Sequence, residues 1–234
     1  ERMKGIDVDE RNMMCTAEAG ATLGELLSEA TKHNLFFPPH PGDEGAQVGG
    51  LIACNAGGSR AVKYGVMRNY VKGLEIVLAD GSVLSLGGKL LKNNTGYDLM
   101  DLFIGSEGTL GVITKAVLKL YPKPGSSATL IIPFESAEDA IDAVSKMSKS
   151  GIISLALEYI EYEWICASAQ HLSLKWPCED GKAQLMLIIS ENSEEIVYAE
   201  CERVDELFAG KEIYMAERRE EQEDVLKIRS NIYT

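Results

Sequence analysis

The sequence predicts an α+β fold in two successive parts: a mixed sheet with helices, and then helices packed on one face of an antiparallel sheet. Three observations predict it. Alternating apolar residues flank Asp80-Gly81, as in a β-hairpin. Prolines, a glycine and serines between 122 and 127 mark a boundary. Beyond that boundary, strand-like and helix-like stretches alternate. With 234 residues, 45% of them hydrophobic, the chain can form one large domain or two small ones.

The first part contains one helix with a well-marked start. Thr22 and Glu25 have the spacing of a capping box, which predicts a helix over 22–34. Prolines and glycines in FFPPHPGDEGAQVGG exclude regular structure up to about Val48. The other elements expected in this part are a strand at 13–20, a hairpin at 74–87, a helical turn at 98–103 and a strand at 111–120.

The second part contains two amphipathic helices with recognisable ends. Ser136 is the expected N-cap of the first helix, and Gly151 its stop. The second helix carries apolar residues at helical spacing from Val197 to Phe208 and stops at Gly210. The strands expected around them are 129–134, 154–160, 184–190 and 212–216.

Charge and composition exclude several classes of function and partner. A net charge of −13 argues against nucleic acid and against anionic membrane surfaces as partners. No apolar run approaches the ~18 residues that span a bilayer, and no signal-peptide pattern opens the chain. The five cysteines form no C-x-x-C pair, which indicates reduced thiols and a cytoplasmic location. The three histidines show no ligand spacing with them, so no metal site is expected.

The segment FIGSEGTLGVITKAVLKLYPKP places Gly105, Gly108 and Gly111 directly before a predicted strand. The phosphate-binding loops of nucleotide folds run strand, glycines, helix, whereas here the order is helix, glycines, strand. Taken alone, this cluster favours a bulge at the start of the strand.

A second glycine cluster, VGGLIACNAGGSRAVKYG, occupies residues 48–65. Paired glycines let a flat ligand or a second backbone approach the main chain closely. In this cluster Asn55 either caps a turn or binds a ligand, and Tyr64 either packs in a core or stacks on a ring. Two such clusters in one part of the chain favour a ligand over turns alone.

The stretch FFPPHPGDEGAQVGGLIACNAGGSRAVKYGVMRNYVKGLEIVLADGSVL, with NTGYDLMDLFIGSEGTLGVITKAVLKLYPKP after it, resembles the FAD-linked oxidases of the vanillyl-alcohol oxidase superfamily. The branch is that of the glycolate oxidase D subunit, D-lactate dehydrogenase and D-2-hydroxyglutarate dehydrogenase. The resemblance implies that residues 1–124 are an FAD-binding domain lacking its N-terminal subdomain. Residues 125–234 would then be the start of the cap domain, truncated at its C-terminus. The missing initiating methionine, and an end inside a predicted helix, lead us to expect a fragment.

The resemblance also implies a cofactor site for FAD. The paired glycine clusters, and the absence of a convincing attachment histidine or cysteine, predict binding without a covalent link. The contacts of the missing subdomain predict poor binding by this fragment. The residues that match the family's cofactor segments are Pro41, Gly42, Gly49, Gly50, Asn55, Gly57, Gly58, Tyr64, Gly65, Glu107, Gly108, Gly111, Val112 and Ile113. Two positions depart from the family pattern. Gln47 stands where relatives often have a hydroxyl residue, and His40 stands where many have an acid.

The activity that the resemblance implies is oxidation of a D-2-hydroxy acid to the 2-oxo acid, with a hydride equivalent passing to FAD N5. The family's catalytic histidines lie in a segment that this chain does not contain, so no catalytic residue is expected here. An electron-transfer protein or iron–sulfur subunit would be a partner. The alternative is a non-catalytic module that docks an electron-transfer subunit.

Arg229 is the candidate substrate residue. It matches an arginine that grips the substrate carboxylate in the branch, and a guanidinium can bind a carboxylate bidentately. Leu226 replaces the aromatic residue of that motif. The alternative for Arg229 is a solvated helix arginine paired with acids among residues 217–224.

Overall fold

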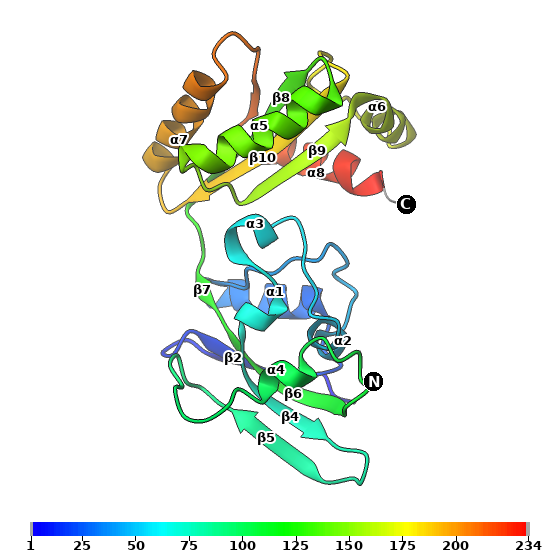
Figure 1. The fold of residues 1–234 in the computed structure, drawn as a ribbon, viewed down its shortest axis with the longest axis vertical. Coiled ribbons are helices and arrows are strands. Elements are labelled where there is room, and N and C mark those ends of the chain that lie inside the picture. Colours follow the sequence, from blue (N-terminus) through cyan, green and yellow to red (C-terminus); the bar gives the residue numbers. More distant parts are fainter. Residues whose placement is uncertain (1, 233–234) are drawn as a thin grey trace. The chain divides into compact units, whose positions relative to one another are not determined.

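The computed structural model describes residues 2–232, which form two compact units that divide between Lys123 and Pro124 (Figure 1). We call them the N-terminal unit and the C-terminal unit and describe each by itself. Within residues 2–232, no helix is long and apolar enough to cross a membrane.

The N-terminal unit is built on a five-stranded sheet with the strand order β1-β2-β6-β4-β5. Its strands are β1 (Ile6–Asp9), β2 (Met14–Glu18), β4 (Val71–Val77), β5 (Val83–Gly87) and β6 (Val112–Lys119). The α+β class is confirmed, but this sheet is antiparallel in all of its described pairings rather than mixed. The β4–β5 hairpin and the strand that follows the Gly105–Gly111 cluster lie where the sequence predicts them.

Short helices and one further strand pair complete this unit. They are α1 (Leu23–Lys32), α2 (Val48–Ala53), α3 (Ala61–Tyr64), the 3-10 helix η1 (Met67–Asn69), α4 (Met100–Phe103), and the paired strands β3 (Leu35–Phe36) and β7 (Tyr121–Pro122). The predicted capping box of α1 is present: the Glu25 N–H donates to Thr22 Oγ1 at 3.2 Å, and the Thr22 N–H to Glu25 Oε2 at 2.8 Å.

One apolar core holds these helices on the sheet. Leu26 of α1 and Ile52 of α2 are fully buried with Ile76 of β4 and Leu118 of β6. Burying each such side chain stabilises the fold by about 1.5–3 kcal/mol. The core therefore fixes α2 over the sheet, although glycines occupy two of its positions.

The C-terminal unit is a four-stranded antiparallel sheet with the order β11-β8-β10-β9 (Figure 1). Its strands are β8 (Ser126–Phe134), β9 (Ala156–Glu161), β10 (Ala183–Glu191) and β11 (Tyr214–Ala216). Its helices are α5 (Ala137–Ser150), α6 (Tyr162–His171), α7 (Glu194–Leu207) and α8 (Arg219–Asn231). Ser136 caps α5 as predicted, and Gly151 ends it with a left-handed φ of 78°.

Helices cover both faces of this sheet, so the prediction of one covered face is wrong. Leu130 and Ile132 of β8 pack with α5 and α7 in one core. Ile131, between them, packs in a second core with Ile165 of α6 and Ile228 of α8. Neighbouring strand residues point to opposite faces, so a continuous buried run such as that of β8 belongs to a sheet covered on both sides.

A histidine at the C-terminal end of α1 makes the stability of the N-terminal unit depend on pH. His33 Nδ1 contacts Glu10 Oε1, and Nε2 lies 3.5 Å from Glu29 Oε1. The hydrogen bond with Glu10, and to a lesser degree the contact with Glu29, raises the pKa of His33 above its ordinary value of 6.5. A raised folded-state pKa gives a stabilisation that is complete below the unfolded pKa and is lost as the pH rises through the folded value.

We therefore expect His33→Gln to lower the free energy of unfolding at about pH 6 and to leave it nearly unchanged at about pH 9. Urea unfolding at the two pH values measures this difference. His171→Gln, at the end of α6 in the other unit, is the matched control. Equal losses at both pH values for His33→Gln would contradict the assigned ion pair.

Candidate functional site

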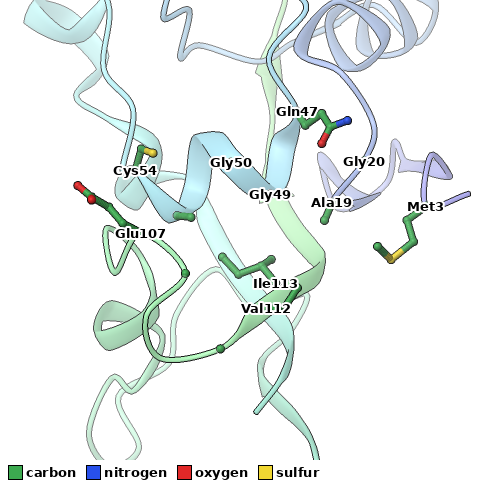
Figure 2. A pocket seen from close by; sticks show the side chains of 13 residues that line it. Met3, Ala19, Gly20, Gln47, Gly49, Gly50, Cys54, Glu107, Val112 and Ile113 are labelled. Carbon is green, nitrogen blue, oxygen red and sulfur yellow. The ribbon is translucent and has the colours of Figure 1, made fainter. Parts of the chain in front are cut away.

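The N-terminal unit contains a pocket of about 530 Å³ beside α2 (Figure 2). In Figure 2, Gly49 and Gly50 on α2 lie across from Val112 and Ile113, where β6 begins. Glu107 lies at one end of the view, and Met3 at the other. The lining residues are Met3, Ala19, Gly20, Gln47, Gly49, Gly50, Ala53, Cys54, Glu107, Gly108, Gly111, Val112 and Ile113.

The pocket brings together the two glycine clusters of the sequence. Seven of the predicted cofactor residues line it: Gly49, Gly50, Glu107, Gly108, Gly111, Val112 and Ile113. Sequence reasoning did not select Met3, Ala19, Gly20, Ala53 or Cys54 as site residues, and it noted Gln47 only as a departure from the family pattern. The small residues Ala19 and Gly20, directly after a strand, carry no signal that separates a pocket wall from a turn.

Backbone hydrogen bonds join the clusters. The Gly105 N–H donates to Ile52 O at 3.1 Å, and the Glu107 N–H donates to Ala53 O at 2.9 Å. The last carbonyls of a helix have no partner within it, so residues 105–107 satisfy the end of α2. Gly105 (φ 83°), Glu107 (φ 53°) and Gly108 (φ 77°) are left-handed, a conformation that favours glycine.

Packing explains two of the pocket glycines. A Cβ on Gly49 would lie 2.7 Å from Ala19 Cβ, and one on Gly111 would lie 2.7 Å from Ile76 Cγ2. Both distances are too short for van der Waals contact. The Gly49 N–H also donates to Ala19 O at 2.9 Å. Glycine therefore allows α2 to lie against the end of β2, and β6 to lie against β4.

Gly50 has no such explanation within the described residues. Its backbone is helical, and an added Cβ would have no atom within 4 Å. Glycine costs a helix about 1 kcal/mol relative to alanine. Alanine would therefore stabilise the helix at this position without a clash, yet the residue is glycine. The space that its missing side chain leaves open belongs to the pocket, which Gly50 lines.

The other seven predicted cofactor residues do not line this pocket. Asn55 Oδ1 accepts a hydrogen bond from the Arg68 N–H at 3.0 Å, so its side chain bridges two turns. A Cβ on Gly58 would lie 2.0 Å from His40 O, which places the chain at 57–58 against His40 and Pro41. Gly42 and Gly65 have φ values of 97° and 75° and serve as turn residues.

Tyr64 lies in a cluster of aromatic rings at the edge of the core. Its ring centroid is 5.9 Å from that of Phe36 and 6.3 Å from that of Tyr121, and its carbonyl accepts the Tyr70 hydroxyl at 2.8 Å. Arg60 stacks over Phe36 at 5.2 Å, and burial lowers the pKa of its guanidinium. Tyr64 thus packs against other aromatic rings, and its assignment to the cofactor stays a prediction.

Glu107 is the one carboxylate among the residues that line the pocket, and no lysine or arginine is among them. The lining also carries an exposed thiol, Cys54, and the amide of Gln47. His40, also noted in the sequence, lies outside the lining and pairs with Glu44 at 3.1 Å. Within the described residues, no group of three or more histidine, cysteine, aspartate or glutamate side chains is placed to hold a metal ion. The pocket therefore offers a ligand mainly backbone and apolar atoms.

Arg229 lies in the C-terminal unit. Its Nε donates to the Glu158 carboxylate on β9, and the two side chains are 22% and 11% exposed. The alternative predicted from the sequence was a pair with acids among residues 217–224, whereas Arg229 pairs with Glu158 on β9. Arg229 also lines a pocket of about 190 Å³ whose other lining residues are Tyr159, Ile160, Glu161, Trp164 and Ile232.

The fold has counterparts among solved structures. Two solved structures of alkyldihydroxyacetonephosphate synthase superpose with TM-scores of 0.74 and 0.77, at 21% and 18% sequence identity. The match covers 97% and 99% of this chain but 45% and 46% of theirs. The two solved structures therefore share the fold of this chain.

The family follows from sequence similarity. Residues 1–87 match the family described as FAD binding domain, and residues 123–234 match FAD linked oxidases, C-terminal domain. The D-lactate dehydrogenase of Archaeoglobus fulgidus is 41% identical over 100% of this chain and 52% of its own length. Glycolate oxidase subunit GlcD of Bacillus subtilis is 37% identical over 86% of this chain and 42% of its own.

The chain therefore belongs to the FAD-linked oxidases, which confirms the resemblance stated from its sequence motifs, and FAD is the cofactor of this family. It spans about half the length of the curated relatives that it matches.

Proposed function

We propose that this chain contributes part of the FAD site to an enzyme that oxidises a D-2-hydroxy acid to the 2-oxo acid. Residues 1–124 are assigned to the FAD-binding domain without its N-terminal subdomain, and residues 125–234 to the start of the cap domain. The relatives named D-lactate dehydrogenase and glycolate oxidase support this class of substrate. When bound, the flavin supplies the acceptor of the hydride equivalent.

Gly50 is the observation that carries the cofactor assignment. Neither a positive φ nor a packed neighbour requires a glycine there, so the requirement that remains is open space in the pocket. Gly49, Gly108 and Gly111 expose the backbone beside it, which allows a flat, extended ligand to approach main-chain groups. In this assignment, Gly49 and Gly50 lie along the flavin and pyrophosphate, and residues 107–113 hold the adenosine half of FAD, without a covalent link.

The substrate assignment rests on Arg229. The guanidinium forms an ion pair with Glu158, and it lines a small pocket with Tyr159, Trp164 and Glu161. The Glu161 carboxylate in this pocket accepts the Trp164 Nε1–H at 3.1 Å. A planar cation in a small pocket suits the carboxylate of a short hydroxy acid. An electron-transfer protein or iron–sulfur subunit would accept the electrons, and the five free cysteines fit a reducing cytoplasm.

Gly50→Ala tests the cofactor assignment. In the full-length protein, we expect the dissociation constant of FAD to rise roughly 10- to 100-fold, because a methyl group in a filled site costs about 1–3 kcal/mol. The thermal stability of the apoprotein should stay equal or rise slightly, since alanine favours the helix. Flavin fluorescence titration and thermal unfolding measure the two quantities.

Gly49→Ala is the matched contrast on the same helix. Its Cβ meets Ala19, so this variant should lose stability even without cofactor. If Gly50→Ala binds FAD as tightly as the wild type, the pocket beside α2 is not the cofactor site.

A further inference from the structure

We propose that Arg68 is a positioning residue for the flavin pocket, which it shapes by holding the turn at residues 104–108 against the end of α2. This inference rests on the proposed function, because it requires the pocket to be the cofactor site. Arg68 itself does not line the pocket.

The contacts of Arg68 join three segments of the N-terminal unit. Its backbone N–H donates to Asn55 Oδ1 at 3.0 Å, directly after the end of α2. Its Nη2 donates to Ile104 O at 2.9 Å. Its Nη1 lies 2.9 Å from Asp101 Oδ1 on α4. One residue of η1 thus fixes both the chain that leaves α2 and the chain that enters the glycine turn.

The turn is held from two sides. Arg68 holds Ile104, and the next residue, Gly105, donates its N–H to Ile52 O on α2. Glu107 then donates its N–H to Ala53 O at 2.9 Å. Glu107 and Gly108 line the pocket immediately after these bonds, so a shift of Ile104 moves the pocket wall.

Asn55 takes part in the same arrangement. Its φ of 47° is left-handed, and its Cβ would lie 3.4 Å from a Cβ built on Gly105. The Asn55 side chain therefore occupies the space between the end of α2 and the turn, and Arg68 fixes its amide group. This contact places Asn55 beside the turn that leads to the pocket lining.

A guanidinium suits this position better than an ammonium. Nη1 and Nη2 bond Asp101 and Ile104 at the same time, in the fixed geometry of a planar fork. A lysine at this position keeps the charge but presents a single nitrogen to both acceptors. Methionine keeps much of the length and apolar stem and removes every side-chain donor.

The test compares Arg68→Met and Arg68→Lys in the full-length protein, with FAD as the probe. We expect Arg68→Met to raise the dissociation constant of FAD about tenfold or more, because the pocket wall loses its charge-assisted hydrogen bonds. The visible absorption bands and circular dichroism of the bound flavin should change with it. Arg68→Lys should lie between methionine and the wild type, and it provides a folded variant if methionine does not fold.

Arg203→Met is the matched control. Arg203 pairs with Glu200 and donates to Ser150 O at 3.0 Å, so it also ties a helix to a neighbouring carbonyl, but in the C-terminal unit. This variant should lower the melting temperature without changing the dissociation constant or the flavin spectrum.

Three results would contradict either the proposed function or the positioning role of Arg68, and each result identifies which of the two fails. A wild-type protein that binds no FAD overturns the proposed function itself. If the wild type binds FAD and Arg68→Met binds it equally well with an unchanged spectrum, the positioning role is overturned and the function stands. Equal weakening by Arg68→Met and Arg203→Met would show a general loss of stability and would also overturn the role.

Discussion

Replacing Gly58 by alanine is expected to lower the free energy of unfolding of the N-terminal unit by about 3 kcal/mol. The new Cβ would lie 2.0 Å from His40 O and 2.9 Å from Pro41 Cα. Both atoms belong to the backbone, so no side-chain rotation relieves the overlap, and the chain around His40 and Pro41 must move. Chemical denaturation of the full-length protein, followed by fluorescence, measures the loss.

The neighbouring glycine provides the control. A Cβ on Gly57 would lie 3.3 Å from Val66 Cγ1, which is the end of a side chain that can shift. Gly57→Ala should therefore cost less than about 1 kcal/mol. Equal stability of Gly58→Ala and the wild type would show that Gly58 does not support the chain at 40–41. The presence of glycine at position 58 would then require another explanation, such as direct contact with the cofactor.

Replacing Arg229 by lysine is expected to raise KM for the hydroxy acid roughly 10- to 100-fold in the full-length enzyme, with flavin content unchanged. Lysine keeps a positive charge beside Glu158, so the ion pair persists and the fold is preserved. Lysine cannot bind the substrate carboxylate bidentately, so the variant loses a hydrogen bond to a charged group. Such a hydrogen bond contributes about 1.5–3 kcal/mol to substrate binding. Steady-state kinetics with D-lactate and with glycolate measure the effect.

Arg219→Lys on the same helix is the matched control, since Arg219 is 91% exposed and pairs with Glu223. It should leave both kinetic constants unchanged. Wild-type kinetics for Arg229→Lys would assign Arg229 to the structural ion pair with Glu158 alone.

Elements with local signals could be predicted from the sequence, because their causes lie within a few residues. The capping box of Thr22 and Glu25 and the Gly151 stop of α5 are examples. Helix α2 could not be predicted in this way, because Gly49 and Gly50 disfavour a helix. It forms because its apolar residues are buried and because a distant turn satisfies its last carbonyls.

Some residues of the candidate site could likewise be predicted from local sequence motifs, and others could not. The family motifs identified Gly50 and Glu107 as members of one site, and the structure brings both to one pocket. Arg68 was not selected, because a lone arginine that bonds a backbone carbonyl leaves no pattern in the sequence. Helix α6 was also missed, and with it the second covered face of the sheet in the C-terminal unit.

The bonds from Gly105 and Glu107 to α2 also bear on the order of folding. They join positions about fifty residues apart, and the entropy of closing a loop grows with its length. Contacts between distant segments form late, whereas the β4–β5 hairpin and α1 depend on local contacts. We therefore expect the flavin pocket to be completed only after β6 has joined β4. A chain still being synthesised would then offer the cofactor no binding surface until residues beyond Gly111 have emerged.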